Sequence, residues 1–321
     1  MAELRRITLA IEQREGDHFR LTAETRHYLR RVLRLGVGDR CIVADGGGQA
    51  WEVELVGLGA TAKDKDDEHG ELDARILKVV EDDATPIGGG CELHLPLVLV
   101  AAVPKGNGFD EVVRQVTELG VASIVPVTSD RTVLDPSPKR VDRWRRIATE
   151  AFEQCERSRI PHLLTPQRWD HWLKTQPIHL ADRPFPWTVD SSSLLKFIAV
   201  ARTDAPSLRR LLIGQVLMKG KQRGESQNLR ESLTSVDPIP SINQIDQINQ
   251  THRGNIQPRG LMIAIGPEGG WTPRERTLAT EAGFQEISLG RRILRAVTAS
   301  VAAVAIGAEA IEDCLRIDDS P

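Results

Sequence analysis

Apolar residues in the first quarter of the chain recur with a period of two. The alternation covers residues 7–11, 51–55 and 72–76. A period of two is typical of strands that bury one face. Thr22 can cap a short helix that runs to about Leu33. Several short strands with one helix predict a small β-barrel domain over residues 1–82.

From about residue 91 the chain changes to long apolar runs that alternate with helical patterns. A linker with Pro86 and three glycines at 88–90 precedes this change. Residues 93–103 are mostly apolar, as in a buried parallel strand. Apolar residues at helical spacing follow over 109–119, then a strand at 124–127 and a helix from Pro138. The order strand, helix, strand, helix predicts an α/β domain with a parallel sheet over residues 91–316.

Two glycine turns lie near the end of the chain. Residues 261–265 form an apolar run of strand length, and Gly266-Pro267-Glu268-Gly269-Gly270 follows it. Residues 272–275 restart a helix with a capping box and a proline at its first position. A second short strand at 286–289 ends at the turn of Gly290. Open α/β sheets bind ligands at the carboxyl ends of their strands, so we expect the two turns to form a ligand site. An ordinary crossover is the alternative for the first turn alone.

The second turn carries unusual chemistry for a structural turn. Its sequence is Gly290-Arg291-Arg292-Ile293-Leu294-Arg295, with a helix expected from near Thr298. Three arginines beside two large apolar residues are not needed to reverse a chain. The mixture favours a binding function.

Charge is uneven along the 321 residues, although the net charge is only −3. Residues 1–40 hold nine arginines and six acidic residues. Arg26, Arg30 and Arg34 fall at i, i+4 and i+8, and no acid lies between them. A solvated surface helix is the alternative, but unpaired arginines on one face suit phosphate contacts. The predicted RNA-contact residues of this region are Arg5, Arg6, Arg26, Arg30, Arg31 and Arg34.

Several classes of protein are disfavoured. Cys41, Cys91, Cys155 and Cys314 are scattered without a CxxC pair, which argues against structural zinc and disulfides and fits a reducing compartment. No His/Cys cluster indicates a metal, so we expect none. No apolar run approaches the roughly 18 residues of a membrane span, and we expect a cytoplasmic protein. Gly214 to Lys221 resembles a phosphate loop but has the wrong spacing.

The glycine turn at 266–270 together with Arg292-Ile293-Leu294-Arg295 resembles the RsmE family, the 16S rRNA uracil-N3 methyltransferases of the SPOUT superfamily. Further matches are Leu4-Arg5-Arg6, residues 27–34, Lys105-Gly106 and residues 117–121. The resemblance covers most of the chain except about 180–258. That stretch is rich in Gln, Asn, Ser and Pro, and we predict a partly disordered insertion there.

The resemblance implies a SPOUT-type domain with a carboxyl-terminal trefoil knot, preceded by a PUA-like barrel that binds RNA. It implies S-adenosylmethionine as the cofactor and 16S rRNA or the small ribosomal subunit as the partner. It also implies a homodimer, for which the apolar helix at 299–311 could supply the interface or simply be core. The cofactor-binding residues would be Ile265, Gly266, Pro267, Glu268, Gly269, Gly270, Leu289, Gly290, Ile293 and Leu294. Further RNA-contact residues would be Lys105, Arg157 and Arg159.

Arg295 is the candidate catalytic residue, because a cation near O2 or O4 would stabilise a uracil that has lost its N3 proton. The family usually has Thr and Glu where this chain has Ala296 and Val297, so one possible base is missing. Gly290-Arg291 also departs from the family's Gly-Pro. Two alternatives stay open: an RNA-binding or assembly module of the same fold without activity, and a SPOUT methyltransferase that acts on another RNA.

Overall fold

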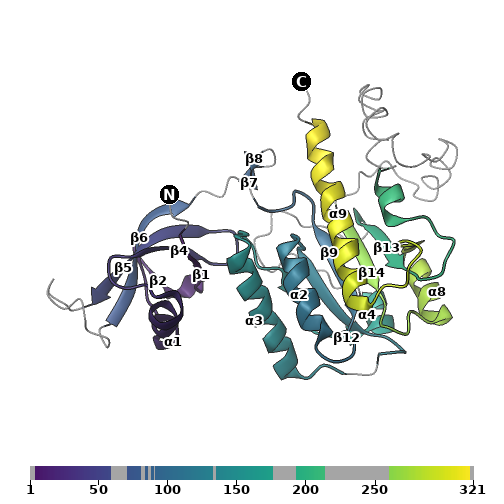
Figure 1. Ribbon diagram of the computed structural model, residues 1–321, viewed down its shortest axis with the longest axis horizontal. Coiled ribbons are helices and arrows are strands. Elements are labelled where there is room, and N and C mark those ends of the chain that lie inside the picture. The colour runs from purple at the N-terminus through teal and green to yellow at the C-terminus, as the bar shows by residue number, and fades with distance from the viewer. Residues whose placement is uncertain are drawn as a thin grey trace. The chain divides into compact units, whose positions relative to one another are not determined.

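The computed structural model describes residues 4–58, 71–80, 84–85, 88–89, 91–132, 135–175, 193–213 and 260–318. The chain forms two compact units (Figure 1). Unit 1 is residues 1–92 with 146–160, and unit 2 is residues 93–145 with 161–321. The phosphate-loop look-alike at 214–221 lies outside the described residues. The domain limits at 82 and 91 stay predictions.

Unit 1 contains a six-stranded sheet in the order β1-β4-β5-β6-β3-β2, with β1 parallel to β4 and the other pairs antiparallel. Its strands are β1 Arg6–Thr8, β2 Arg14–Glu15, β3 His18–Phe19, β4 Arg40–Ala44, β5 Ala50–Leu58 and β6 Glu71–Val80. A separate hairpin joins β7 Ala84–Thr85 to β8 Gly88–Gly89. The alternating residues Ile7, Trp51, Val53 and Leu72 are buried in one core, as their period predicts.

The helical segment of unit 1 differs from the prediction. A 3-10 turn, η1 Ile11–Gln13, comes first. Thr22 caps α1 Ala23–His27 by accepting the N–H of Thr25, as predicted. The segment then continues as a π-helix, η2 Tyr28–Leu33, and ends at Arg34, whose φ is 58°. The shared arginine face assumed one α-helix through Leu33, and the π-helical turn and left-handed Arg34 break that spacing.

Unit 2 is built on a parallel sheet in the order β11-β10-β9-β14-β13-β15, with β12 also paired to β10. The strands are β9 Leu97–Ala102, β10 Ser123–Thr128, β11 His162–Leu163, β12 Gln167–Arg168, β13 Leu195–Ala199, β14 Leu261–Ile265 and β15 Gln285–Ile287. The α/β class with a parallel sheet is confirmed. Within the predicted insertion at about 180–258, β13 pairs with both β14 and β15 inside the sheet, so this part of the stretch is ordered.

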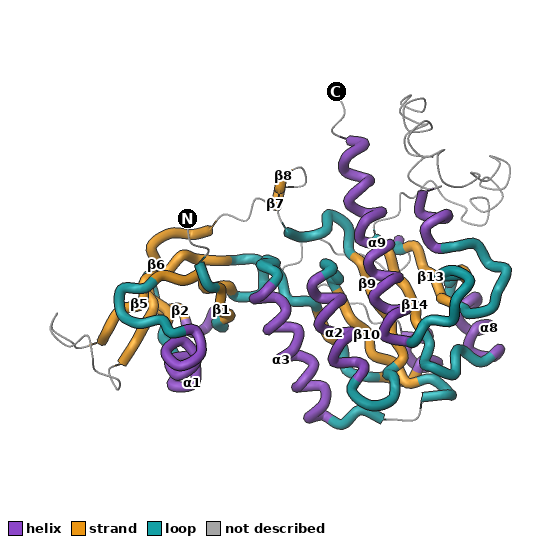
Figure 2. Tube along the Cα trace, in the orientation of Figure 1, coloured by secondary structure: helices purple, strands orange, loops and turns teal. Residues whose placement is uncertain are grey.

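Helices flank this sheet (Figures 1 and 2). They are α2 Gly108–Glu118, α3 Pro138–Gln154, α4 Trp169–Thr175, α8 Pro273–Glu281 and α9 Ala296–Asp318; residues 146–154 of α3 belong to unit 1. Successive side chains of a strand point to opposite faces. Gly307 of α9 therefore meets Leu97, Leu261 and Ile263 on one face, and a Cβ at Gly307 would lie 2.8 Å from Leu261 Cδ2.

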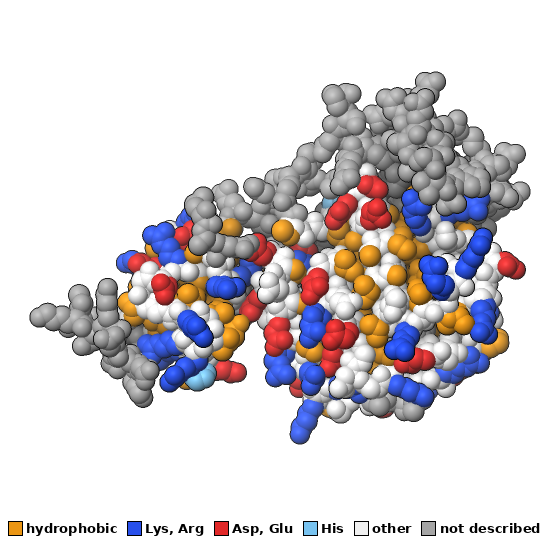
Figure 3. All heavy atoms as spheres, viewed as in Figure 1, with side chains coloured by type: hydrophobic (Ala, Val, Ile, Leu, Met, Phe, Trp, Pro, Cys, Tyr) orange, Lys and Arg blue, Asp and Glu red, His pale blue; other side chains and the backbone are white. Residues whose placement is uncertain are grey.

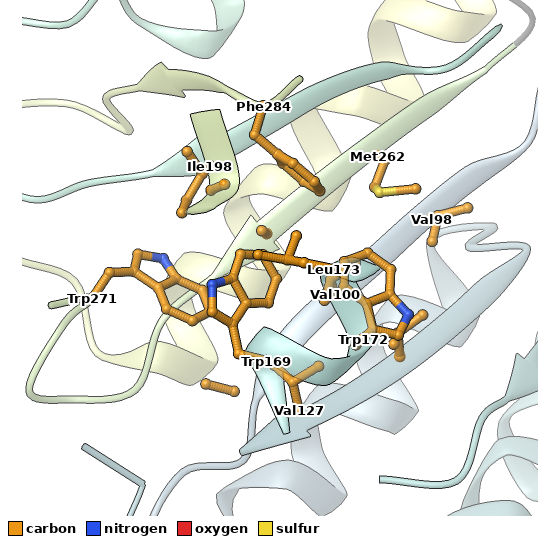
Figure 4. Close-up of a cluster of buried hydrophobic side chains, with 14 of the residues drawn as sticks. Val98, Val100, Val127, Trp169, Trp172, Leu173, Ile198, Met262, Trp271 and Phe284 are labelled. Carbon is orange, nitrogen blue, oxygen red and sulfur yellow. The ribbon is translucent and has the colours of Figure 1, made fainter. Parts of the chain in front are cut away.

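The opposite face of the sheet packs on an aromatic cluster (Figure 4). Trp169 lies with its ring centroid 4.6 Å from Trp271 and 5.6 Å from Trp172, and Phe284 meets both Trp169 and Trp172 edge-on. Trp271 follows the first glycine turn directly, so its packing in this cluster anchors the end of that turn. Among the described helices, none is long and apolar enough to cross a membrane.

Candidate functional site

The two glycine turns lie at one edge of the unit 2 sheet. Residues 266–270 follow β14, and Gly290 follows β15 after two residues beyond the strand. Because the sheet is parallel, these carboxyl ends share an edge, and only β13 separates the two strands. Neighbouring strands are about 4.8 Å apart, so the turns begin about 10 Å from each other. That distance suits a ligand held between them.

The first turn, hereafter the GPEGG loop (residues 266–270), needs its glycines for different reasons. A Cβ at Gly266 would lie 3.1 Å from Trp271 Nε1, and one at Gly269 would lie 3.1 Å from Arg131 Cδ. Gly270 has a φ of +68°, which favours glycine. The N–H of Gly270 donates to Pro267 O at 2.8 Å and closes the turn. The sequence therefore permits both the close packing and the tight reversal.

Two neighbouring loops hold the GPEGG loop by hydrogen bonds. The N–H of Lys105, after β9, donates to Glu268 Oε1 at 3.1 Å. Arg131, after β10, donates from Nη1 to Gly269 O and packs its side chain on Gly269. Sequence reasoning missed Arg131, since nothing local to residues 129–132 signals a contact with residue 269.

The helix after the GPEGG loop is fixed by Glu275, which is only 2% exposed. Thr272 and Glu275 form the predicted capping box. Beside this box, Asp130 and Asp170 face Arg168 and Arg274 at 3.2–3.5 Å. Burial acts to raise the pKa of Asp170, but Arg168 and Arg274 outweigh it and lower that pKa. The group ties β12, α4 and α8 to the loop after β10.

The second turn, hereafter the RILR loop (residues 290–295), presents both apolar and cationic side chains. Ile293 is 63% exposed, and Leu289 and Leu294 are half-buried. Arg291, Arg292 and Arg295 are exposed, and within the described parts of the chain their side chains make no hydrogen bond or ion pair. They stand before the amino terminus of α9, whose first turn has no acid. Positive side chains are unfavourable at this end of a helix, because the helix dipole is positive there. An anionic ligand would offset the repulsion between these arginines and the helix dipole.

Val297, where the family usually has Glu, packs against the start of α2. Its Cγ2 would lie 3.0 Å from a Cβ on Gly108. The side chain is half-buried and apolar, so this position supplies neither a base nor a charge to the RILR loop. The structure therefore shows what Val297 does in this chain: it joins α9 to α2.

The residues at this edge fit an adenosine-bearing cofactor. Gly270 and Gly290 have open space where a Cβ would lie, so the backbone there can approach a ligand closely, and Ile293, Leu289 and Leu294 leave apolar surface uncovered. The side chain of Ile293 is exposed beside the two half-buried leucines, so its apolar surface is available to a ligand. Among the described residues, no group of three or more His, Cys, Asp or Glu could hold a metal ion.

In unit 1, three predicted RNA-contact arginines come together, and all three have protein partners. Arg6 donates from Nη1 to Glu156 O at 2.9 Å and to Arg157 O. Arg159 donates to Gly47 O, and its guanidinium covers Gly48. Arg157 is 2% exposed and makes a two-pronged ion pair with Glu92, with Nη2 to Oε2 at 2.7 Å. Burial therefore removes Arg157 from the predicted RNA-contact residues.

The remaining predicted RNA-contact residues are accessible. Arg5, Arg31 and Arg34 of unit 1 are exposed, whereas Arg26 and Arg30 are half-buried. Arg26 also donates from Nε to Leu21 O at 3.0 Å. Lys105 of unit 2 is exposed beside the GPEGG loop. Exposure makes these residues available to RNA, and their contact with RNA stays a prediction.

Comparison with known families defines the class of protein. A family model for an RNA methyltransferase domain matches residues 91–204 and 224–308. A second model, for the PUA domain of RNA methyltransferases, matches residues 21–63. The chain is thus an RNA methyltransferase with an amino-terminal PUA-like domain, which confirms the predicted class.

Relatives narrow the class. The ribosomal RNA small subunit methyltransferase E of Synechocystis is 34% identical over 94% of this chain and 76% of its own length. That of Bacillus subtilis is 23% identical over 90% of this chain and 89% of its own length. The chain belongs to the ribosomal RNA small subunit methyltransferase E family, as the GPEGG and RILR loops predict.

Solved structures agree with the fold. The ribosomal RNA small subunit methyltransferase E of Neisseria gonorrhoeae, a structure bound to S-adenosyl methionine, is 25% identical with a TM-score of 0.65, covering 94% of this chain and 96% of that one. A Legionella pneumophila methyltransferase structure has a TM-score of 0.64 at 23% identity, covering 95% of this chain and 97% of that one. At this identity the second likeness supports the fold alone.

Proposed function

We propose that this protein transfers the methyl group of S-adenosylmethionine to N3 of a uridine in the RNA of the small ribosomal subunit. One observation carries the proposal: the GPEGG and RILR loops both lie at the carboxyl edge of a parallel sheet in a chain of this family. Open α/β sheets bind ligands at this edge. The Neisseria relative holds S-adenosyl methionine.

The cofactor would be held by Ile265, Gly266, Pro267, Gly269, Gly270, Leu289, Gly290, Ile293 and Leu294, and by the main chain of Glu268, whose carboxylate instead accepts the N–H of Lys105. When bound, it supplies an electrophilic methyl group on a sulfonium. The two loops contribute orientation, since each runs from a strand of the sheet into a helix and alignment accounts for much of such catalysis. Ile293 and Leu294 would exclude water from the adenine, which explains an exposed isoleucine at the RILR loop.

Arg295 would stabilise the negative charge that develops on a uracil oxygen as N3 loses its proton. Its guanidinium is exposed and makes no ion pair within the described residues, so its charge is available to a substrate. Its backbone oxygen accepts the N–H of Ala299 at 2.8 Å, which fixes its main chain at the start of α9. Val297 leaves the removal of the N3 proton to another group or to water.

Arg5, Arg6, Arg26, Arg30, Arg31, Arg34, Lys105 and Arg159 would bind the RNA backbone, in a PUA-like domain over residues 1–82 and at the edge of the SPOUT domain over 91–316. A carboxyl-terminal knot, as in the superfamily, would bring the GPEGG and RILR loops together. The knot rests on the family alone, and the RNA contacts rest on the family and on exposed positive charge. The rRNA substrate would be met in the cytoplasm.

Two copies would pair through the outer side of α9. Val301, Ala302, Ala305 and Ile306 are only half-buried there, and Figure 3 shows apolar side chains over this helix. A Val301→Glu substitution should reduce the mass measured by light scattering from dimer to monomer. A wild-type chain that is a monomer at micromolar concentration would contradict pairing.

The function is tested in a bacterial strain that lacks its own family member. Mass spectrometry of small-subunit rRNA should show N3-methyluridine when this chain is expressed and none with an empty vector. An Arg295→Ala variant serves as the matched control. Absence of the modified base despite a folded, expressed protein would contradict the proposal. Calorimetric titration with S-adenosylmethionine then separates an inactive binding module, which fails to bind, from an enzyme acting on another RNA.

A further inference from the structure

The carboxylate of Glu268 joins two loops that the proposed function gives to different reactants. Glu268 belongs to the GPEGG loop, which would hold the cofactor. Its Oε1 accepts the N–H of Lys105 at 3.1 Å, although the two residues lie 163 positions apart. Lys105 begins the turn at 105–107, between β9 and α2, and its side chain is a predicted RNA contact. A single charge-assisted hydrogen bond therefore links the two regions.

The turn at 105–107 is otherwise lightly held. Its three residues are exposed, and Gly106 has a φ of +67° with open space around its Cα. Arg140 donates from its guanidinium to Gly106 O and to Asn107 Oδ1. A turn with few packed side chains has several accessible conformations, so one extra hydrogen bond changes their populations.

We propose that Glu268 is a positioning residue that couples cofactor binding to RNA binding. The proposal rests on the proposed function of the two loops. Residues 266–270 lose conformational freedom when they close on a cofactor, and Glu268 passes that restriction to Lys105. RNA then meets a turn that is already ordered and pays less of the ordering cost itself. Coupling of this kind is reciprocal, so bound RNA strengthens cofactor binding by the same factor.

The bond also fits a conformational role better than a purely structural one. It is exposed at both partners, so its loss leaves no buried polar group unsatisfied. The sheet core beneath, including Val98 and Met262, does not depend on it. Removing Glu268 should therefore leave the fold intact while releasing the turn.

The experiment measures the affinity of an unmodified small-subunit rRNA transcript with and without S-adenosylhomocysteine, which binds without reacting. In the wild type, saturating S-adenosylhomocysteine should tighten RNA binding about fivefold, at the lower end of typical coupling. In Glu268→Ala this ratio should fall to about one, while the affinity for S-adenosylhomocysteine alone stays within about threefold. Glu268→Gln should keep the ratio, because its amide oxygen can accept the same N–H. Glu111→Ala, an exposed substitution on α2, is the matched control and should keep it too.

Three results would overturn the coupling. The ratio could persist in Glu268→Ala, or it could equal one in a wild type that binds both ligands. Glu268→Ala could also lose S-adenosylhomocysteine affinity by more than about threefold, which would make the carboxylate of Glu268 a cofactor contact instead. A wild type that binds no S-adenosylhomocysteine contradicts the proposed function, and is thus a separate result.

Discussion

The backbone N–H of Asp130 donates to Oε1 of Glu275 at 2.8 Å, although 145 positions separate the two residues. Glu275 Oε2 accepts from the N–H of Thr272 at 2.8 Å and from its hydroxyl at 3.0 Å. One buried carboxylate thus caps α8 and also fixes the loop after β10. Both elements adjoin the GPEGG loop, so Glu275 fixes the positions of the two segments between which that loop lies.

Glu275→Ala should destabilise the protein by about 2–4 kcal/mol. The substitution removes bonds to a charged acceptor and leaves part-buried N–H donors of Asp130 and Thr272 unpaired. Urea unfolding followed by tryptophan fluorescence measures the change. Glu281→Ala, at the exposed end of the same helix, should stay within about 0.5 kcal/mol. Equal effects of the two substitutions would show that the buried carboxylate has no special role.

Arg157→Ala should cost about 3–5 kcal/mol, because it leaves the carboxylate of Glu92 without its cation in a mostly buried setting. Glu92 also accepts hydrogen bonds from the N–H groups of Ser158 and Arg159 at 3.1 and 2.9 Å, so its carboxylate holds this backbone segment as well as Arg157. The change is measured by urea unfolding. Arg145→Ala, on the exposed side of α3, is the control. A large loss of RNA affinity in a fully stable Arg157→Ala protein would instead restore Arg157 to the RNA-contact residues.

The stability of unit 1 should depend on pH through Glu153. Burial raises the pKa of Glu153, hydrogen bonds from Thr8 oppose the rise, and Glu150 adds to it. A carboxyl with a raised folded pKa binds its proton more tightly when folded. Its contribution to stability therefore falls as pH rises from below the ordinary Glu pKa through the raised one.

Glu153→Gln removes this loss and keeps an oxygen for the N–H of Thr8. Its melting temperature relative to the wild type should therefore increase between about pH 4 and pH 8. Circular dichroism across that range measures the difference. A difference that does not change with pH would contradict the assignment, and Glu150→Gln, which is exposed, should show a smaller trend.

Arg295→Ala should lower single-turnover methyl transfer by about 10²–10³-fold while cofactor affinity stays within about tenfold. The reason is that Arg295 would act on charge that develops only during the reaction. Calorimetry gives the affinity, and a radiolabelled methyl group gives the rate. Arg291→Ala, in the same loop, should slow transfer much less. Parallel losses of rate and cofactor affinity would make Arg295 a cofactor-binding residue.

The thiol of Cys41 should be unreactive in the folded protein. Burial raises the pKa of Cys41 to about 12, with a further contribution from Asp39, so little thiolate forms near neutral pH. Exposed Cys91 should react with iodoacetamide first. Mass spectrometry of labelled peptides distinguishes the two. Equal labelling rates in native protein would show that unit 1 opens more readily than its core indicates.

Much of the local structure follows from the sequence alone. The period-two pattern around Trp51 and Val53 predicts buried strand positions, and the Thr272–Glu275 spacing predicts the capping box. The GPEGG and RILR loops predict the family and the position of the site at the sheet edge. These features depend on residues a few positions apart, where backbone geometry alone decides which side chains meet.

The tertiary structure decided the rest. Arg157 looks like a surface cation until Glu92, 65 positions away, is placed against it. Residues 194–200 form a mostly apolar run of strand length, but only the pairing of β13 with β14 and β15 shows that this run belongs to the sheet. Asp130 and Glu275 likewise meet only because two separate strands end at one edge. Such contacts leave no signature in the nearby sequence. They form only when the whole fold brings distant parts of the chain together.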